Sequence, residues 1–349
     1  MRILLATDAW PPQVNGVVRT LAEVRRELAA MGHSVVVVHP GLFRSVPCPF
    51  YPEVRLALPL SRRIAAIIEA AAPQAIHIAT EGPIGVAMRH WCLRHGREFT
   101  TAFHTRFAEY LAQRGVLPAR VTYGLLRRFH APSGGVMVAS ERVRSELAAR
   151  GFHNLRAWGR GVDTTQFSPD CEGIPLSLPR PTFLSVGRVA PEKNLPAFLS
   201  LDLPGSKVVV GDGPQLATLR RQFPEAHFLG RRDHADLPAL YAAADVLVFP
   251  SRTDTFGLVL LEALACGLPV AAYPVAGPLD IIGDSGAGVL DEDLRAAALA
   301  ALQIPRDRCR ARALGFTWEA SAREFVANLL PLPGMSHIAP RATPPQRAA

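Results

Sequence analysis

Short runs of apolar residues alternate with longer amphipathic segments along the first 150 residues. The short runs predict buried strands, and the segments with apolar residues three and four positions apart predict helices. Strands are expected at 3–6, 35–38, 75–79, 99–102 and 135–139, and helices at 16–31, 62–71, 84–94 and 141–149. Alternation of this kind is typical of a parallel sheet covered by helices on both faces.

A second series follows a polar stretch, 159–181, which contains four prolines and reads as an interdomain segment. Strands are expected at 182–186, 207–210, 227–229, 246–249 and 269–272, with helices after 214, over 236–243 and over 258–265. We therefore predict an α/β protein with two doubly wound, Rossmann-like domains facing across a cleft. The predicted parts are an N-terminal domain (1–165), a linker (166–181), a C-terminal domain (182–312), a final helix (313–331) and a disordered tail (332–349).

Composition narrows the class of protein. With 349 residues, of which 49% are hydrophobic, the chain can bury a sizeable core in each domain. No apolar run approaches the ~18 residues needed to span a bilayer, and no signal segment precedes the first strand, so a cytoplasmic protein is expected. The five cysteines are scattered, which indicates neither a disulfide framework nor a zinc site.

Positive charge is concentrated in the first half of the chain. Residues 1–165 contain 21 Lys+Arg against 11 Asp+Glu, a net charge of +10, whereas residues 166–349 contain 17 against 19, a net of −2. A basic face attracts anionic membranes or nucleic acids. The basic stretches carry no nucleic-acid motif or interleaved aromatic residues, so we prefer the membrane; an ordinary solvated surface is the alternative.

The segment 251–270 carries the clearest chemistry. Asp254 and Glu262 lie eight positions apart around Gly257, which is expected to open a helix just after a strand. Open α/β sheets bind ligands at the carboxyl ends of strands, and free N–H groups at a helix start attract anions such as a diphosphate. The two carboxylates can then accept hydrogen bonds from sugar and ribose hydroxyls. The alternative is a helix cap for Asp254 and a solvated surface position for Glu262.

This segment resembles the motif of glycosyltransferase family 4, retaining enzymes of the GT-B fold in which two glutamates are separated by seven residues. Asp254 stands at the first glutamate, so its side chain is one methylene shorter. The resemblance covers residues 1–330, and within the family it points to GDP-mannose-dependent mannosyltransferases and to glycosyl- and sulfoquinovosyl-diacylglycerol synthases. It implies sugar transfer from a UDP-hexose or GDP-mannose to a hydroxyl with retention, and a last helix that crosses back to the N-terminal domain.

The resemblance also implies the site residues. On the donor side they are Gly187, Arg188, Lys193, Gly213, Asp254, Phe256, Gly257, Leu258 and Glu262, and on the acceptor side Asn15, Gly16, His104 and Arg160. Arg188 and Lys193 would hold the diphosphate, Glu262 the ribose and Asp254 the sugar, with His104 beside the sugar or acceptor. An arginine and a lysine can neutralise a leaving diphosphate together, so no metal and no other cofactor is expected.

The acceptor is less sharply defined. The basic first domain favours a membrane lipid such as diacylglycerol, with Arg62-Arg63 and Arg127-Arg128 as candidate headgroup contacts, and hence a peripheral protein on the inner face of the cell membrane. A soluble glycan or small molecule is the alternative acceptor. An epimerase or phosphorylase of the same fold, and a non-catalytic nucleotide-sugar sensor in which Asp254 no longer supports transfer, are the alternative functions.

Overall fold

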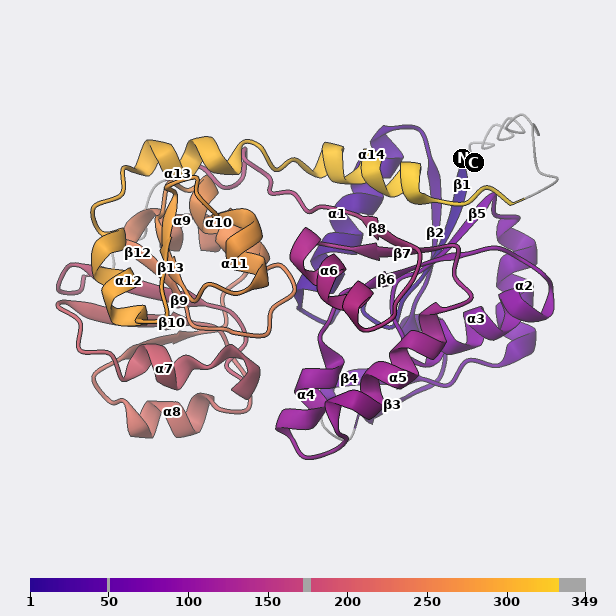
Figure 1. Cartoon of the computed structure of the whole chain (residues 1–349), viewed down its shortest axis with the longest axis horizontal. Coiled ribbons are helices and arrows are strands. Elements are labelled where there is room, and N and C mark those ends of the chain that lie inside the picture. The colour runs from indigo at the N-terminus through magenta and orange to yellow at the C-terminus, as the bar shows by residue number, and fades with distance from the viewer. Residues whose placement is uncertain (49–50, 172–176, 333–349) are drawn as a thin grey trace, which may run out of the picture.

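The computed structural model describes residues 1–48, 51–171 and 177–332. Two α/β domains lie side by side, and the chain passes between them twice, the second time near its C-terminus (Figure 1). Each domain is built on its own six-stranded sheet, and every strand pair in the described part of these two sheets is parallel. The prediction of two doubly wound parallel sheets is confirmed.

The N-terminal sheet has the strand order β2-β1-β5-β6-β7-β8. Ile3 and Leu5 of the first strand pack into one core cluster and Leu4 into another, because alternate side chains point to opposite, helix-covered faces. The strands are β1 (Arg2–Ala6), β2 (Ser34–Val38), β5 (Ala75–Ile78), β6 (Thr100–Phe103), β7 (Gly135–Val138) and β8 (Leu155–Ala157). The helices are α1 (Gly16–Ala30), α2 (Ser61–Ala71), α3 (Pro83–Arg94), α4 (Phe107–Gln113), α5 (Ala119–His130) and α6 (Glu141–Ala149), with a 3-10 turn, η1 (Pro40–Leu42).

The C-terminal sheet has the order β11-β10-β9-β12-β13-β14. Its strands are β9 (Thr182–Val186), β10 (Ser206–Val210), β11 (His227–Gly230), β12 (Val246–Phe249), β13 (Val270–Ala272) and β14 (Gly288–Leu290). The helices are α7 (Leu195–Leu199), α8 (Leu216–Gln222), α9 (Leu237–Ala243), α10 (Leu258–Ala265), α11 (Ala276–Ile281), α12 (Leu294–Ala301) and α13 (Arg306–Ala313), with a 3-10 turn, η2 (Pro191–Lys193).

In both sheets the first strand has neighbours on both sides, because the chain adds later strands first on one side of it and then on the other. β1 lies between β2 and β5, and β9 lies between β10 and β12. Such a reversal opens a crevice outside the carboxyl ends of the strands, where α/β proteins bind ligands. The loops after β1, β9 and β12 therefore lie at the two crevices.

The last helix, α14 (Trp318–Asn328), lies on the N-terminal domain although it follows the C-terminal one in sequence (Figure 1). It packs along α1, and its Phe325 ring lies 5.1 Å from the ring of Trp158. Thr317 caps the helix by accepting a hydrogen bond from the N–H of Ala320 at 3.1 Å. The second crossing therefore ends in a buried contact with the N-terminal core. The predicted disordered tail lies almost entirely outside the described residues.

Several elements had no prediction from the pattern. They are the antiparallel hairpin β3 (Ser45–Cys48) and β4 (Tyr51–Ala57), helices α4, α5, α11 and α13, and strands β8 and β14. Helix α5 is amphipathic: Tyr123 and Leu126 are buried, and Val121 and Leu125 continue the same apolar side of the helix into an exposed area. None of the helices in the described part of the chain is long and apolar enough to cross a bilayer.

Candidate active site

Two helix N-termini approach each other across the domain boundary. Gly257 caps α10 with φ +94°, a conformation that glycine adopts readily, and the described residues provide no side-chain cap there. Across the boundary, a Cβ placed on Gly16 of α1 would lie 3.8 Å from Cδ1 of Leu258. Uncapped N–H groups at a helix start, next to a second helix start, form a favourable place for an anion.

Asn15 has a structural task at the start of α1. Its Oδ1 accepts hydrogen bonds from the N–H groups of Val17 and Val18, both at 3.0 Å. This N-cap occupies N–H groups that the family resemblance would turn toward a phosphate. The structure thus brings Asn15 and Gly16 to the predicted place, with Gly16 as the closer neighbour of the donor loop.

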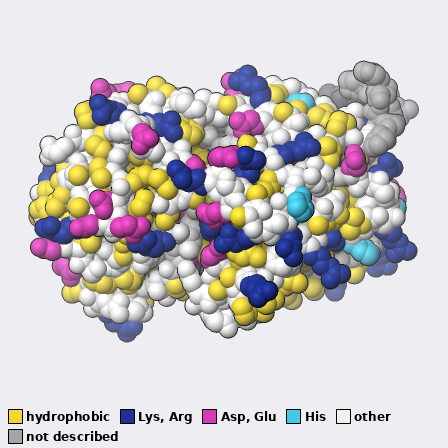
Figure 2. Space-filling view, in the orientation of Figure 1, with side chains coloured by type: hydrophobic (Ala, Val, Ile, Leu, Met, Phe, Trp, Pro, Cys, Tyr) yellow, Lys and Arg dark blue, Asp and Glu magenta, His cyan; other side chains and the backbone are white. Residues whose placement is uncertain are grey.

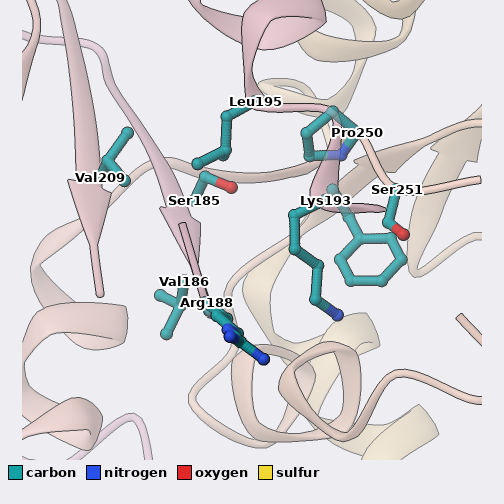
Figure 3. A pocket seen from close by; sticks show the side chains of 10 residues that line it. Ser185, Val186, Arg188, Lys193, Leu195, Val209, Pro250 and Ser251 are labelled. Atoms are coloured by element: carbon teal, nitrogen blue, oxygen red, sulfur yellow. The ribbon is translucent and has the colours of Figure 1, made fainter. Parts of the chain in front are cut away.

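Lys193 and Asp254 form an ion pair in the loops after β9 and β12. The Lys193 Nζ lies 2.6 and 2.9 Å from the two carboxylate oxygens of Asp254. In Figure 3, Arg188 and Lys193 extend in the same direction from a pocket that is also lined by Gly187 and Ser251. Gly187 has φ +148°, and apart from its two chain neighbours no described residue has an atom within 4 Å of where its Cβ would be, which leaves its backbone open to a ligand.

Glu262 is buried, which excludes the alternative of a solvated surface position. Its Oε1 lies 3.0 Å from Nε2 of His234, and its Oε2 accepts a hydrogen bond from the hydroxyl of Tyr241 at 3.1 Å. Burial and the neighbouring Glu262 raise the pKa of Tyr241 well above its usual range, so its hydroxyl remains a donor. Two side chains therefore hold the carboxylate in one orientation.

His104 and Arg160 form a second buried pair, on the N-terminal side. Nδ1 of His104 lies 3.3 Å from Nη2 of Arg160. Burial lowers the pKa of Arg160 to about 9, so it stays charged at neutral pH. Burial and then the charge of Arg160 lower the pKa of His104 well below its ordinary value, so its ring is neutral. Because a guanidinium only donates, Nδ1 of His104 accepts and Nε2 carries the hydrogen.

The hydrogen on Nε2 of His104 has no partner among the described residues, although the atom is buried. An unpaired buried donor costs about 1–3 kcal/mol, which a ligand oxygen would recover. The hydroxyl of Thr255 donates to the backbone carbonyl of His104 at 2.7 Å, and this bond brings the Asp254 loop against it. His104 thus lies where the two halves of the predicted site meet.

Two predicted ligand contacts have packing explanations. Gly213 has φ +157°, and a Cβ there would lie 2.4 Å from the carbonyl oxygen of Val189. The side chain of Phe256 is buried in the C-terminal core. Contact of Gly213 and Phe256 with a ligand stays a prediction, and only their backbone groups would take part in it.

Sequence reasoning assigned no role to several residues that support the site. They are Arg19, Trp158, His234, Tyr241 and Thr255. His234 lies in a loop without a motif, Thr255 lies between two motif residues without a role of its own, and Tyr241 and Trp158 resemble ordinary core residues. In the described ranges, no three His, Cys, Asp or Glu side chains could together hold a metal ion. Independence from metal stays a prediction.

The site lies between two crevices that face each other. It combines the uncapped start of α10, the start of α1 at Gly16, and the ion pair of Lys193 and Asp254. This arrangement defines a GT-B glycosyltransferase that uses nucleotide sugars. Two family models match the chain: glycosyltransferase family 4 over residues 14–166, and glycosyl transferases group 1 over residues 172–304. The chain belongs to glycosyltransferase family 4. The predictions of family, fold and enzyme class are thereby confirmed.

Individual relatives extend this result. A GDP-mannose-dependent alpha-mannosyltransferase of Mycolicibacterium smegmatis is 30% identical over 83% of this chain and 84% of its own. An alpha-monoglucosyldiacylglycerol synthase of Streptococcus pneumoniae is 28% identical over 93% of this chain and 83% of its own. Among solved structures, a sucrose-phosphate synthase of Thermosynechococcus elongatus has a TM-score of 0.75 at 21% identity, covering 93% of this chain and 97% of that chain. This last match shows the shared fold.

Proposed function

We propose that this protein transfers a hexosyl group from GDP-mannose or a UDP-hexose to a hydroxyl of a membrane lipid such as diacylglycerol, with retention of configuration. The observation that carries the proposal is the set of Arg188, the Lys193–Asp254 pair and the start of α10 around one crevice. The names of the mannosyltransferase and the diacylglycerol synthase support the donor and acceptor classes.

The chemistry follows from charge. As the bond between sugar and diphosphate breaks, negative charge grows on the phosphate oxygens, and Arg188, Lys193 and the first turn of α10 stabilise it. Lys193 exchanges part of its contact with Asp254 for a phosphate oxygen, which leaves the carboxylate of Asp254 to accept hydrogen bonds from sugar hydroxyls. Glu262 accepts hydrogen bonds from the ribose.

The acceptor attacks on the side that the diphosphate leaves, and this same-side attack retains the configuration. A phosphate oxygen takes the acceptor proton, so the protein needs no separate base. Neutral His104 donates its Nε2 hydrogen to an oxygen of the sugar or acceptor, and Arg160 holds the ring by donating to Nδ1. The protein thus contributes positioning and charge stabilisation.

The proposed membrane contact is an exposed face formed by α4, α5 and the loop between them, here called the α4–α5 face. Figure 2 shows hydrophobic and basic side chains together over this part of the N-terminal domain. The exposed apolar members are Phe107, Leu117, Val121 and Leu125, and the exposed basic members on α5 are Arg120, Arg127 and Arg128. Apolar side chains that enter the headgroup region, flanked by arginines, fit an anionic bilayer surface.

Replacing Val121 and Leu125 together by glutamate should weaken binding to phosphatidylglycerol vesicles by at least about tenfold, because each change removes an apolar contact and adds repulsion. Vesicle co-sedimentation measures this loss. The control replaces Val86 and Leu93 of α3, which are 52% and 45% exposed, by glutamate. An equal loss in the control would mean that general repulsion, and not the α4–α5 face, governs binding.

The proposed function is tested with labelled GDP-mannose, UDP-glucose, UDP-galactose and UDP-glucuronate, each offered with anionic vesicles that contain diacylglycerol, in EDTA. Label from one donor in the lipid phase supports the proposal. Transfer that EDTA abolishes would contradict metal independence. Label that enters only soluble glycans would mean that the acceptor is a glycan and not a lipid. Donor binding without any turnover would favour the sensor.

A further inference from the structure

A single imidazole connects Glu262 to the other domain. Nε2 of His234 lies 3.0 Å from Oε1 of Glu262. Its Nδ1 lies 2.6 Å from Nη2 of Arg19 and 3.1 Å from Nε2 of Gln166. Arg19 belongs to α1 of the N-terminal domain, Gln166 to the segment between the domains, and His234 to the loop between β11 and α9. Three separate parts of the chain therefore meet at one side chain.

The partners determine which ring nitrogen carries the hydrogen. A guanidinium has only donors, so Nδ1 of His234 must accept from Arg19. The hydrogen is then on Nε2, where it is donated to the carboxylate of Glu262. The ring of Phe167 packs edge-on against the imidazole at 4.9 Å and holds its plane. The contacts of His234 with Arg19 of α1 and with Gln166 thus select the tautomer that Glu262 requires.

Glu262 keeps its capacity for a ligand in this arrangement. One oxygen accepts from His234 and the other from Tyr241, and a carboxylate oxygen has a second lone pair. The carboxylate is therefore oriented without being saturated, and incoming hydroxyl groups can still bind to it.

We propose that His234 is a positioning residue that couples contact between the two domains to the orientation of Glu262. The inference rests on the proposed function, in which Glu262 holds the donor ribose. The series Arg19, His234, Glu262 is complete only while α1 lies against the C-terminal domain. Separation of the domains removes Arg19 from Nδ1 of His234, so α1 no longer enforces the tautomer that donates to Oε1 of Glu262, while Tyr241 still donates to Oε2. Domain contact thus favours donor binding, and by linkage donor binding favours domain contact.

The test measures the affinity of the full chain for GDP and for UDP by isothermal titration calorimetry, and follows the tighter nucleotide in variants. Arg19→Met and His234→Phe should each weaken binding by about tenfold, within the usual range of coupling between sites. The double variant should be no weaker than His234→Phe alone, because Arg19 acts through the imidazole. Arg25→Met, on an exposed position of α1, should leave the affinity unchanged.

A conservative variant separates positioning from general support of the fold. His234→Gln provides an amide N–H that can reach Glu262, and an amide has no tautomer for Arg19 to select. It should recover most of the affinity, and Arg19→Met should have no further effect in that background. A structural role alone would not produce this pattern.

The outcomes distinguish the inference from the proposed function. Additive losses in the double variant, or unchanged affinity in His234→Phe, would overturn the inference while nucleotide binding persists. A wild-type chain that binds neither GDP nor UDP would overturn the proposed function, and the inference with it. Thermal unfolding of each variant confirms that the compared proteins are folded.

Discussion

Replacement of Lys193 by methionine is expected to lower kcat/KM for sugar transfer by about 10²–10³-fold, the usual effect of removing one group that stabilises transition-state charge. Methionine keeps an unbranched apolar stem like that of lysine and lacks only its terminal ammonium group, so the loss reports that group. Its Nζ lies 2.6 Å from Asp254 in the pocket that Arg188 also lines. Steady-state transfer at saturating acceptor measures the change.

The chain provides a matched control in Lys207, its other lysine. Lys207 lies in β10, and its Nζ donates to the backbone carbonyls of Leu199 and Leu201, the second at 2.9 Å. Lys207→Met should therefore reduce stability and leave kcat/KM of the folded enzyme near wild type. Nearly full activity in Lys193→Met, or an equal loss of activity in Lys207→Met, would show that Lys193 does not stabilise the transition state.

Replacement of Trp158 by alanine is expected to lower the free energy of unfolding by about 3–5 kcal/mol, as large-to-small changes of buried aromatic residues do. Trp158 is fully buried. Its ring lies 5.1 Å from Phe325 of α14 and 5.4 Å from His104, and Cζ of Arg160 lies 4.1 Å from its centroid. The change leaves a cavity where the last helix meets the N-terminal core and removes the surface on which Arg160 stacks. Urea unfolding measures the loss.

Transfer activity should fall with this stability, because His104 and Arg160 lose a rigid neighbour. Trp158→Phe keeps an aromatic ring and should lose less of both. Trp91 serves as the comparison, since it is only half-buried on α3 and stacks on His95 of the same segment. If Trp91→Ala lowered the free energy of unfolding as much as Trp158→Ala, the loss in Trp158→Ala would not be due to its contact with α14.

Much of the architecture was accessible from the sequence because its determinants are local. Apolar runs such as 246–249 and the helix that follows Gly257 depend on residues only a few positions apart. The same local pattern placed Lys193 and Asp254 in loops that follow strands, and Glu262 in the helix after the second of these loops. Helix α5 was missed although it is amphipathic, and its exposed Val121 and Leu125 belong to the surface proposed to meet a membrane.

The sequence by itself determined the α/β class, the two domains and the donor motif, since periodicity and glycine positions express local backbone preferences. Only the tertiary structure decided the partners of the site residues. Arg19 and His234 are 215 positions apart, and Thr255 and His104 are 151 apart. No local pattern encodes such pairs, because they form when two separately built sheets and a returning helix are packed together. The physical reason is that secondary structure follows neighbours along the chain, whereas side-chain orientation, burial and pKa follow neighbours in space.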